Sequence, residues 1–136
     1  MSLSFHIGDY SAEIGSSAFL HAFFSTICYR LEGGKWGSKY PEFMKELYQG
    51  KLEANNAMET LQEVMEIREK LKTFSPKEII WDIDNLQKRP PWGDKISPHI
   101  TNLSNYFVTS DGKDLFEVLI ACLQRLEGSN FPLTIS

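Results

Sequence analysis

Two aspartates in the stretch IIWDID, at residues 79–84, are the first candidates for chemistry in this sequence. On an extended strand, Asp82 and Asp84 project from one face, as two ligands of a hard divalent cation would. Asp94 and Asp111 could add carboxylates to such a site. Aspartate is also common in turns and at strand ends, and no histidine falls at a recognised metal-ligand spacing from this pair. A small metal-dependent hydrolase is therefore the alternative interpretation, and the leading one is non-catalytic.

Other arrangements of nucleophiles and bases are weaker. Cys28 follows His21 by seven residues, so both fall near one side of a helix, but the surrounding run is apolar and a buried, inert thiol is expected. The three histidines, His6, His21 and His99, show no zinc-ligand spacing, and no phosphate-binding glycine loop or CxxC pair is present. We therefore expect no enzyme, no cofactor and no metal.

Two tryptophans lie in segments that the residue types mark as loops. Trp36 belongs to the glycine-rich stretch GGKWGS, and Trp92 follows two prolines in PPWGD, which ends with Asp94. A tryptophan on a stiff loop loses little entropy on docking, so Trp36, Trp92 and Asp94 are candidates for binding a partner. The alternative for each indole is inward packing against the core, since large aromatic side chains dominate core burial.

A row of glutamates follows the amphipathic segment 52–72. The apolar residues of the same segment recur at helical spacing and are expected on the buried side of the helix. They include Leu52, Met58, Val64 and Met65. Glu59, Glu63 and Glu66 are candidates for contacting a basic partner, and the alternative is a solvated helix face.

The remaining helices and strands are predicted from the spacing of apolar residues and from the residues that begin or end such elements. Apolar helical runs at 17–32 and 115–126 predict two buried helices, the first capped by Ser16 or Ser17 and the second by Asp111. A short helix is expected from Pro41 to Tyr48. Strands are predicted at 3–7, at 79–84 and at 131–135, with a further short one at 105–110.

These elements predict an α+β fold for one domain spanning residues 1–136. Two buried apolar helices and one amphipathic helix should pack against a small β-sheet that joins both ends of the chain. A chain of this length is large enough to bury a core without disulfides or metals.

Charge and composition restrict the partners. The net charge of −4 disfavours nucleic acid and anionic membranes as partners, because both require phosphate-neutralising Lys and Arg. Cys28 and Cys122 lie in apolar runs, as reduced thiols of a cytosolic protein would. The N-terminus has no signal-peptide pattern, and a cytoplasmic location is expected.

The segments PPWGD at 90–94 and ISPHITNLSNYFVTSDGKDLFEVL at 96–119 resemble the immunity protein 70 family of bacterial polymorphic toxin systems. The resemblance covers most of the chain and is strongest from Trp81 to Leu126. It implies a small cytoplasmic protein that binds and neutralises the toxin of the cell that makes it. It implies neither catalytic residues nor a list of contact residues.

The leading hypothesis is therefore stoichiometric inhibition of a cognate toxin, with the candidate contacts Trp92, Asp94, Trp36, Glu59, Glu63 and Glu66. Two alternatives stay open: the metal-dependent hydrolase, and a ligand-binding regulatory module with a closed apolar pocket. Association of the chain into homo-oligomers also stays open.

Overall fold

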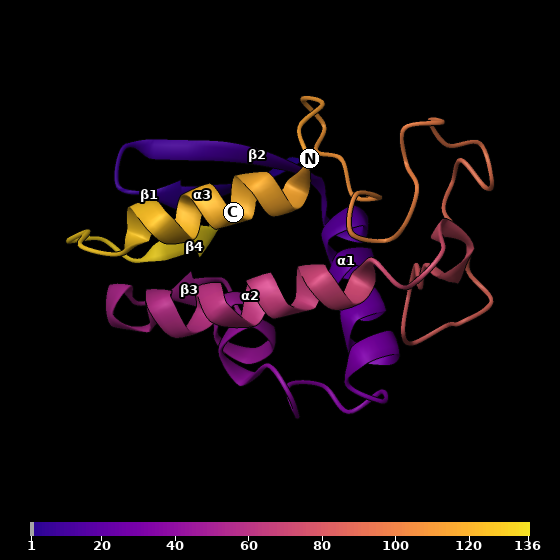
Figure 1. The fold of residues 1–136 in the computed structure, drawn as a ribbon. Helices are drawn as coiled ribbons and strands as arrows, with labels where there is room; N and C mark the ends of the chain where they lie inside the picture. The colour runs from indigo at the N-terminus through magenta and orange to yellow at the C-terminus, as the bar shows by residue number, and fades with distance from the viewer. Residues whose placement is uncertain (1) are drawn as a thin grey trace.

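A computed structural model describes residues 2–136, in which helices pack against a single antiparallel sheet (Figure 1). This arrangement confirms the predicted α+β class. In chain order the elements are β1 (Ser2–Ile7), β2 (Tyr10–Ser16), α1 (Ser17–Leu31), the π-helix η1 (Glu42–Leu47), β3 (Lys51–Leu52), the 3-10 turn η2 (Ala54–Asn56), α2 (Ala57–Leu71), the 3-10 turn η3 (Pro76–Glu78), α3 (Leu115–Leu126) and β4 (Leu133–Ile135).

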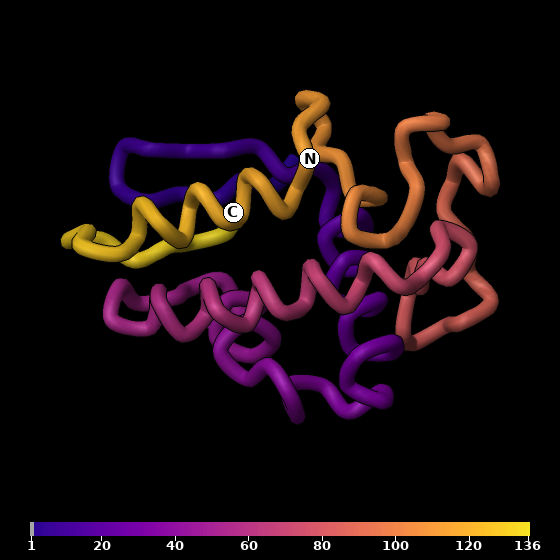
Figure 2. The backbone as a smooth tube through the Cα atoms, viewed as in Figure 1, coloured from indigo at the N-terminus to yellow at the C-terminus, as the bar shows by residue number. Residues whose placement is uncertain are grey.

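The sheet has the strand order β2-β1-β4-β3, so the C-terminal strand lies between the N-terminal strand and β3. Phe5 pairs with Ile135, and the main-chain N–H of Ser4 donates to the carbonyl of Ser136 at 2.9 Å. The two ends of the chain therefore meet in one sheet, as predicted (Figure 2).

Strand β2 was missed in the sequence analysis. It forms a hairpin with β1 through the turn at Gly8 and Asp9, where Gly8 has a positive φ of 56° that a two-residue hairpin turn requires. Only Ile14 among the bulky apolar side chains of β2 is fully buried. Tyr10, Ala12 and Ile14 alternate with Ser11 and Glu13, but Tyr10 and Ala12 are only partly buried, so the apolar signal of this strand is weak.

Both predicted apolar helices are present and buried. Ser16 caps α1 by accepting a hydrogen bond from the N–H of Phe19 at 3.1 Å, as expected. The cap of α3 is Asp114 and not Asp111: the Asp114 carboxylate accepts from the N–H groups of Phe116 and Glu117, at 2.9 and 3.3 Å. Asp111 instead binds the hydroxyl of Thr109 in the preceding turn.

The amphipathic helix α2 begins at Ala57 and not at residue 52, because Lys51 and Leu52 pair with β4. Its inner face carries Val64, Ile67 and Leu71. Met58 and Met65, predicted to be buried, are 47% and 53% exposed. Both lie on the glutamate side of the helix, where an unbranched, flexible side chain is tolerated in water.

The predicted strand at 79–84 is absent from the described chain. Ser75 and Glu78 form a capping box that turns residues 76–78 into η3. Beyond it, the N–H of Ile80 donates to the hydroxyl of Thr26 on α1 at 3.1 Å, and the Ile80 carbonyl lies 3.1 Å from the same oxygen. The hydroxyl of Thr26 thus makes the main-chain hydrogen bonds that a neighbouring strand would otherwise make.

The predicted strand at 105–110 is reduced to a single bridge between Val108 and Asp114. As a result, the chain from Ile79 to Lys113 is largely irregular and occupies one side of the molecule, beyond the end of α2 (Figures 1 and 2). This irregular side carries the PPWGD loop.

The core lies between the sheet and the three long helices. Phe23 of α1 is central to it, with ring centroids 5.0, 5.1 and 5.9 Å from those of Phe107, Phe116 and Phe43. These contacts are edge-to-face, the geometry that aromatic quadrupoles favour. Within residues 2–136, no helix combines the length and apolarity that crossing a bilayer requires.

Candidate functional site

The PPWGD loop holds the indole of Trp92 at the surface in one defined orientation. The indole N–H donates to the hydroxyl of Tyr106 at 2.9 Å, and the ring meets Trp81 edge to face at a centroid distance of 5.3 Å. The N–H of Gly93 closes a turn onto the carbonyl of Pro90 at 2.9 Å. The Trp92 residue is nevertheless 38% exposed. A large aromatic surface is therefore fixed and still open to solvent.

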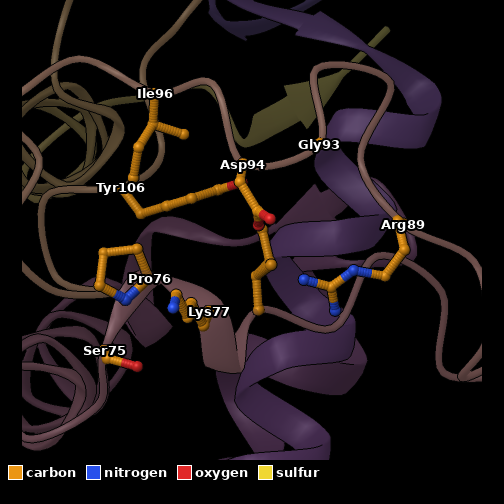
Figure 3. Close-up of a pocket in the computed structure, with 9 residues that line it drawn as sticks. Ser75, Pro76, Lys77, Arg89, Gly93, Asp94, Ile96 and Tyr106 are labelled. Atoms are coloured by element: carbon orange, nitrogen blue, oxygen red, sulfur yellow. The ribbon is translucent and has the colours of Figure 1, made fainter.

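Two hollows flank this loop and share Ile96 and Tyr106 as common walls. The first, of about 200 Å³, lies between the loop and the turn at Ser75–Lys77 (Figure 3). The second, of about 330 Å³, lies on the side of Trp92, Ile100 and Val108. Val108 is 43% exposed, so the surface beside the indole is apolar as well as concave.

Charged side chains surround the first hollow. Arg89 points toward it from one side, and Lys77 and Asp94 also line it (Figure 3). Asp94, one of the predicted contact residues, is exposed. The polar groups around an apolar depression are those that the rim of a protein interface carries.

The three predicted glutamates lie together on a second surface. A groove of about 350 Å³ is lined by Lys39, Tyr40, Glu59, Gln62, Glu63 and Glu66. Glu59 and Glu66 are exposed, so two carboxylates of this acidic groove face solvent. Glu66 also forms an ion pair with Lys70 of the same helix, at 3.4 Å.

Glu63 has a structural role that the helical periodicity did not reveal. Its carboxylate accepts the N–H groups of Phe43 at 2.8 Å and Glu42 at 3.4 Å, at the start of η1. Partial burial raises the pKa of Glu63, although these two hydrogen bonds act in the opposite direction. Glu63 therefore ties α2 to η1, and its carboxylate is only partly available to a partner.

Two polar atoms beside the acidic groove have no hydrogen bond within residues 2–136: the hydroxyl oxygen of Tyr40 and Oε2 of Glu42. Tyr40 is 2% exposed, and burial raises its pKa to about 12, so the hydroxyl keeps its proton. Glu66 and Lys70 lie near it without forming a hydrogen bond. Burial, and then the charges of Glu59 and Glu46, raise the pKa of Glu42. A cationic group in the groove would relieve these repulsions.

Trp36 packs inward, which is the alternative that its position in the sequence left open. Its indole N–H donates to the carbonyl of Met44 at 2.7 Å, and its ring stacks on Phe24 at 6.2 Å with an angle of 21°. The loop is shaped by the buried carboxylate of Glu32, which accepts three main-chain N–H groups, those of Gly37, Lys39 and Tyr40. The half-buried Trp36 therefore braces the core and has less area to offer a partner than Trp92.

His21 lies beside Asp82 and Asp84, the two aspartates of the IIWDID stretch. Nε2 of His21 lies 3.2 Å from Oδ1 of Asp82, and ligating atoms of His21, Asp82 and Asp84 all lie within 4.8 Å of one another. Nδ1 of His21 lies 2.9 Å from the hydroxyl of Tyr48. No spacing rule could have found this cluster, because 61 residues separate His21 from Asp82.

Both cysteines are free, fully buried thiols. Burial raises the pKa of Cys28 and of Cys122 to about 11. Each thiol therefore stays protonated at neutral pH, as expected for structural cysteines and unlike an activated nucleophile.

Fold and surfaces together define a small α+β protein with a fixed, exposed aromatic loop and a separate acidic groove. The family model described as Immunity protein 70 matches residues 5–135, nearly the whole chain, and the chain belongs to that family. This confirms the resemblance found in the sequence. No curated protein and no solved structure gave a significant match. The chain is thus an immunity protein, a class whose partner is a toxin protein.

Proposed function

We propose that this immunity protein neutralises one cognate toxin by stoichiometric binding, without catalysis, in the cytoplasm of the cell that makes both. The family match to residues 5–135 is the observation that carries the proposal. The two unpaired, buried cysteines are in keeping with a reducing compartment.

Trp92 is the anchor that we propose for this interaction. Binding hot spots are enriched in tryptophan, and an anchor that is already ordered loses little conformational entropy on binding. Trp92 meets both conditions, because Tyr106 and Trp81 hold the ring while 38% of the residue remains exposed. Asp94 and Arg89 would then form polar contacts around the anchor.

The acidic groove is the second proposed contact and would receive a Lys or Arg side chain of the toxin. Glu59 and Glu66 supply the charge, because both are exposed and line the groove. The net charge of −4 would also steer a basic toxin toward the chain, so the association rate should fall as salt is raised.

A ligand-binding module is less well supported. The hollow between the PPWGD loop and the turn at Ser75–Lys77 measures about 200 Å³, below the range of roughly 300–1,000 Å³ that is typical of small-molecule sites. The two larger hollows are open depressions at the surface. Shallow concave surfaces of this kind suit protruding side chains of a protein partner better than an enclosed ligand.

Co-expression with the cognate toxin domain tests the proposal. Cells should survive only with the immunity protein, and mixing the two purified proteins should give a one-to-one complex that lacks toxin activity. Protection by a small fraction of an equivalent would contradict the proposal, because it would require turnover. Failure to protect at all would contradict it equally.

A further inference from the structure

The cluster of His21, Asp82 and Asp84 joins two parts of the chain by side chains alone. His21 projects from α1, and the two aspartates come from the irregular segment that replaces the predicted strand. The side chains of His21 and Asp82 are 29% and 22% exposed, so water and small ions can reach them. Neither the Trp92 loop nor the acidic groove includes any of these residues.

We propose that His21, Asp82 and Asp84 form a binding site for a divalent transition-metal ion, with Zn²⁺ the preferred probe. One imidazole and two carboxylates are a ligand set that Zn²⁺ uses, and affinity for Zn²⁺ in mixed nitrogen and oxygen sites generally exceeds that for Mn²⁺. Three protein ligands leave a fourth position for water, as in open tetrahedral zinc sites. The site is independent of toxin neutralisation.

The distances in the cluster suit such an ion. Metal–ligand bonds of about 2.1 Å in a tetrahedral site place neighbouring ligand atoms about 3.4 Å apart. Nε2 of His21 and Oδ1 of Asp82 already lie 3.2 Å apart, and Asp84 lies within 4.8 Å of both. Asp84 is exposed and needs only a small side-chain movement to complete the set.

Tyr48 provides the outer partner that a metal-binding histidine normally has. Its hydroxyl lies 2.9 Å from Nδ1 of His21, so it can accept the ring N–H once Nε2 binds a metal. The N–H of Asp84 donates to Oδ1 of Asp82 at 2.9 Å, which holds the two aspartates beside each other.

Lys88 competes for the same carboxylate. Its Nζ lies 3.9 Å from Oδ2 of Asp82, and its side chain is 60% exposed. An exposed ion pair of this kind is weak and should be displaced by a divalent cation. Removing Lys88 should therefore strengthen metal binding, which a purely structural hydrogen-bond cluster does not predict.

Calorimetric titration of the full chain with Zn²⁺ tests the proposal. We expect one ion per chain, and a rise in Tm of about 5–10 °C when free Zn²⁺ exceeds Kd a hundredfold. Asp84→Asn should weaken binding by at least about tenfold, and Lys88→Ala should strengthen it by roughly twofold to fivefold. Asp84 is exposed, so the asparagine variant should fold normally.

Matched controls separate this site from adventitious zinc binding. Asp9→Asn, an exposed aspartate in the β1–β2 turn, should bind like the wild type. So should the double variant His6→Ala and His99→Ala, whereas His21→Ala should lose binding. Absence of heat and of a Tm shift would overturn the proposal. Binding that survives Asp84→Asn and His21→Ala would overturn it as well, whatever the result with the toxin.

Discussion

The indole N–H of Trp92 donates to the hydroxyl of Tyr106 at 2.9 Å, which couples an exposed ring on the PPWGD loop to the core. Tyr106 is 5% exposed, and its own ring packs edge to face on Phe107 at 5.2 Å. The orientation of the surface indole is therefore set by a buried residue. Two prolines in the same loop reduce the conformations that the free protein must give up on binding.

Truncation of Trp92 should weaken toxin binding, and it should also lower stability, because the buried Tyr106 hydroxyl loses its hydrogen-bond partner. We expect Trp92→Ala to cost about 2 kcal/mol of binding free energy, roughly a thirtyfold rise in Kd, because hot-spot tryptophans carry contributions of that size. Calorimetry with the toxin measures this, and thermal unfolding measures stability in parallel. Leu86→Ala, at a 50% exposed leucine, is the control and should bind like the wild type. Unchanged affinity with a lowered Tm would mark Trp92 as a core residue instead.

The hydroxyl of Thr26 should contribute strongly to stability, because it holds the segment that follows η3 against α1. It accepts the N–H of Ile80 at 3.1 Å and lies 2.8 Å from the carbonyl of Ala22, in a fully buried position. Thr26→Val keeps the shape but leaves the Ile80 N–H unpaired, which should lower the free energy of unfolding by about 2–3 kcal/mol. Urea unfolding measures this. Thr26→Ser retains the hydroxyl and should lose less than about 1 kcal/mol, from one methyl group.

Glu63 should tolerate loss of its charge but not loss of its acceptor. Its pKa is raised by burial, so the folded state favours the protonated form and the ionised carboxylate opposes folding at neutral pH. Glu63→Gln keeps an oxygen for the N–H of Phe43 and should change stability by less than about 0.5 kcal/mol. Glu63→Ala removes the cap and should cost about 1–2 kcal/mol. Equal destabilisation by both substitutions in urea unfolding would show that the charge itself is required.

The sequence allowed the regular elements with strong periodicity to be predicted. Both apolar helices and the pairing of the two chain ends were correct, because their side chains alone determine which face is buried. Two of the errors arise where one side-chain hydrogen bond decides the local structure. Thr26 takes the place of a strand partner for Ile80, and Asp114 caps a helix for which Asp111 was an equally good candidate.

The candidate sites differ in the same way: local spacing predicts some of them, and the packing of distant segments forms the others. Grouping of Glu59, Glu63 and Glu66 follows from helical spacing and was predictable. The proximity of His21 to Asp82 and Asp84 depends on how α1 packs against an irregular segment, which no local pattern encodes. The inward packing of Trp36 could not be separated from exposure either, because the acceptor of its N–H is the main-chain carbonyl of Met44.

Stability should decline at alkaline pH through the two buried cysteines. The pKa of each thiol is about 11 in the folded state, against a usual value of 9.0. Between these values the unfolded chain loses protons that the folded chain retains, so the free energy of unfolding falls as pH rises from 9 to 11. The expected loss is about 2–3 kcal/mol per thiol.

Urea unfolding between pH 9 and 11, under reducing conditions, measures this loss of stability. The double variant Cys28→Ala and Cys122→Ala should start less stable at pH 8 and show a shallower decline. The remaining decline comes from Tyr40, whose pKa burial raises to about 12, and from Tyr48 and Tyr106, whose pKa values burial also raises. An unchanged slope in that variant would mean that the thiols ionise in the folded protein as readily as in the unfolded chain.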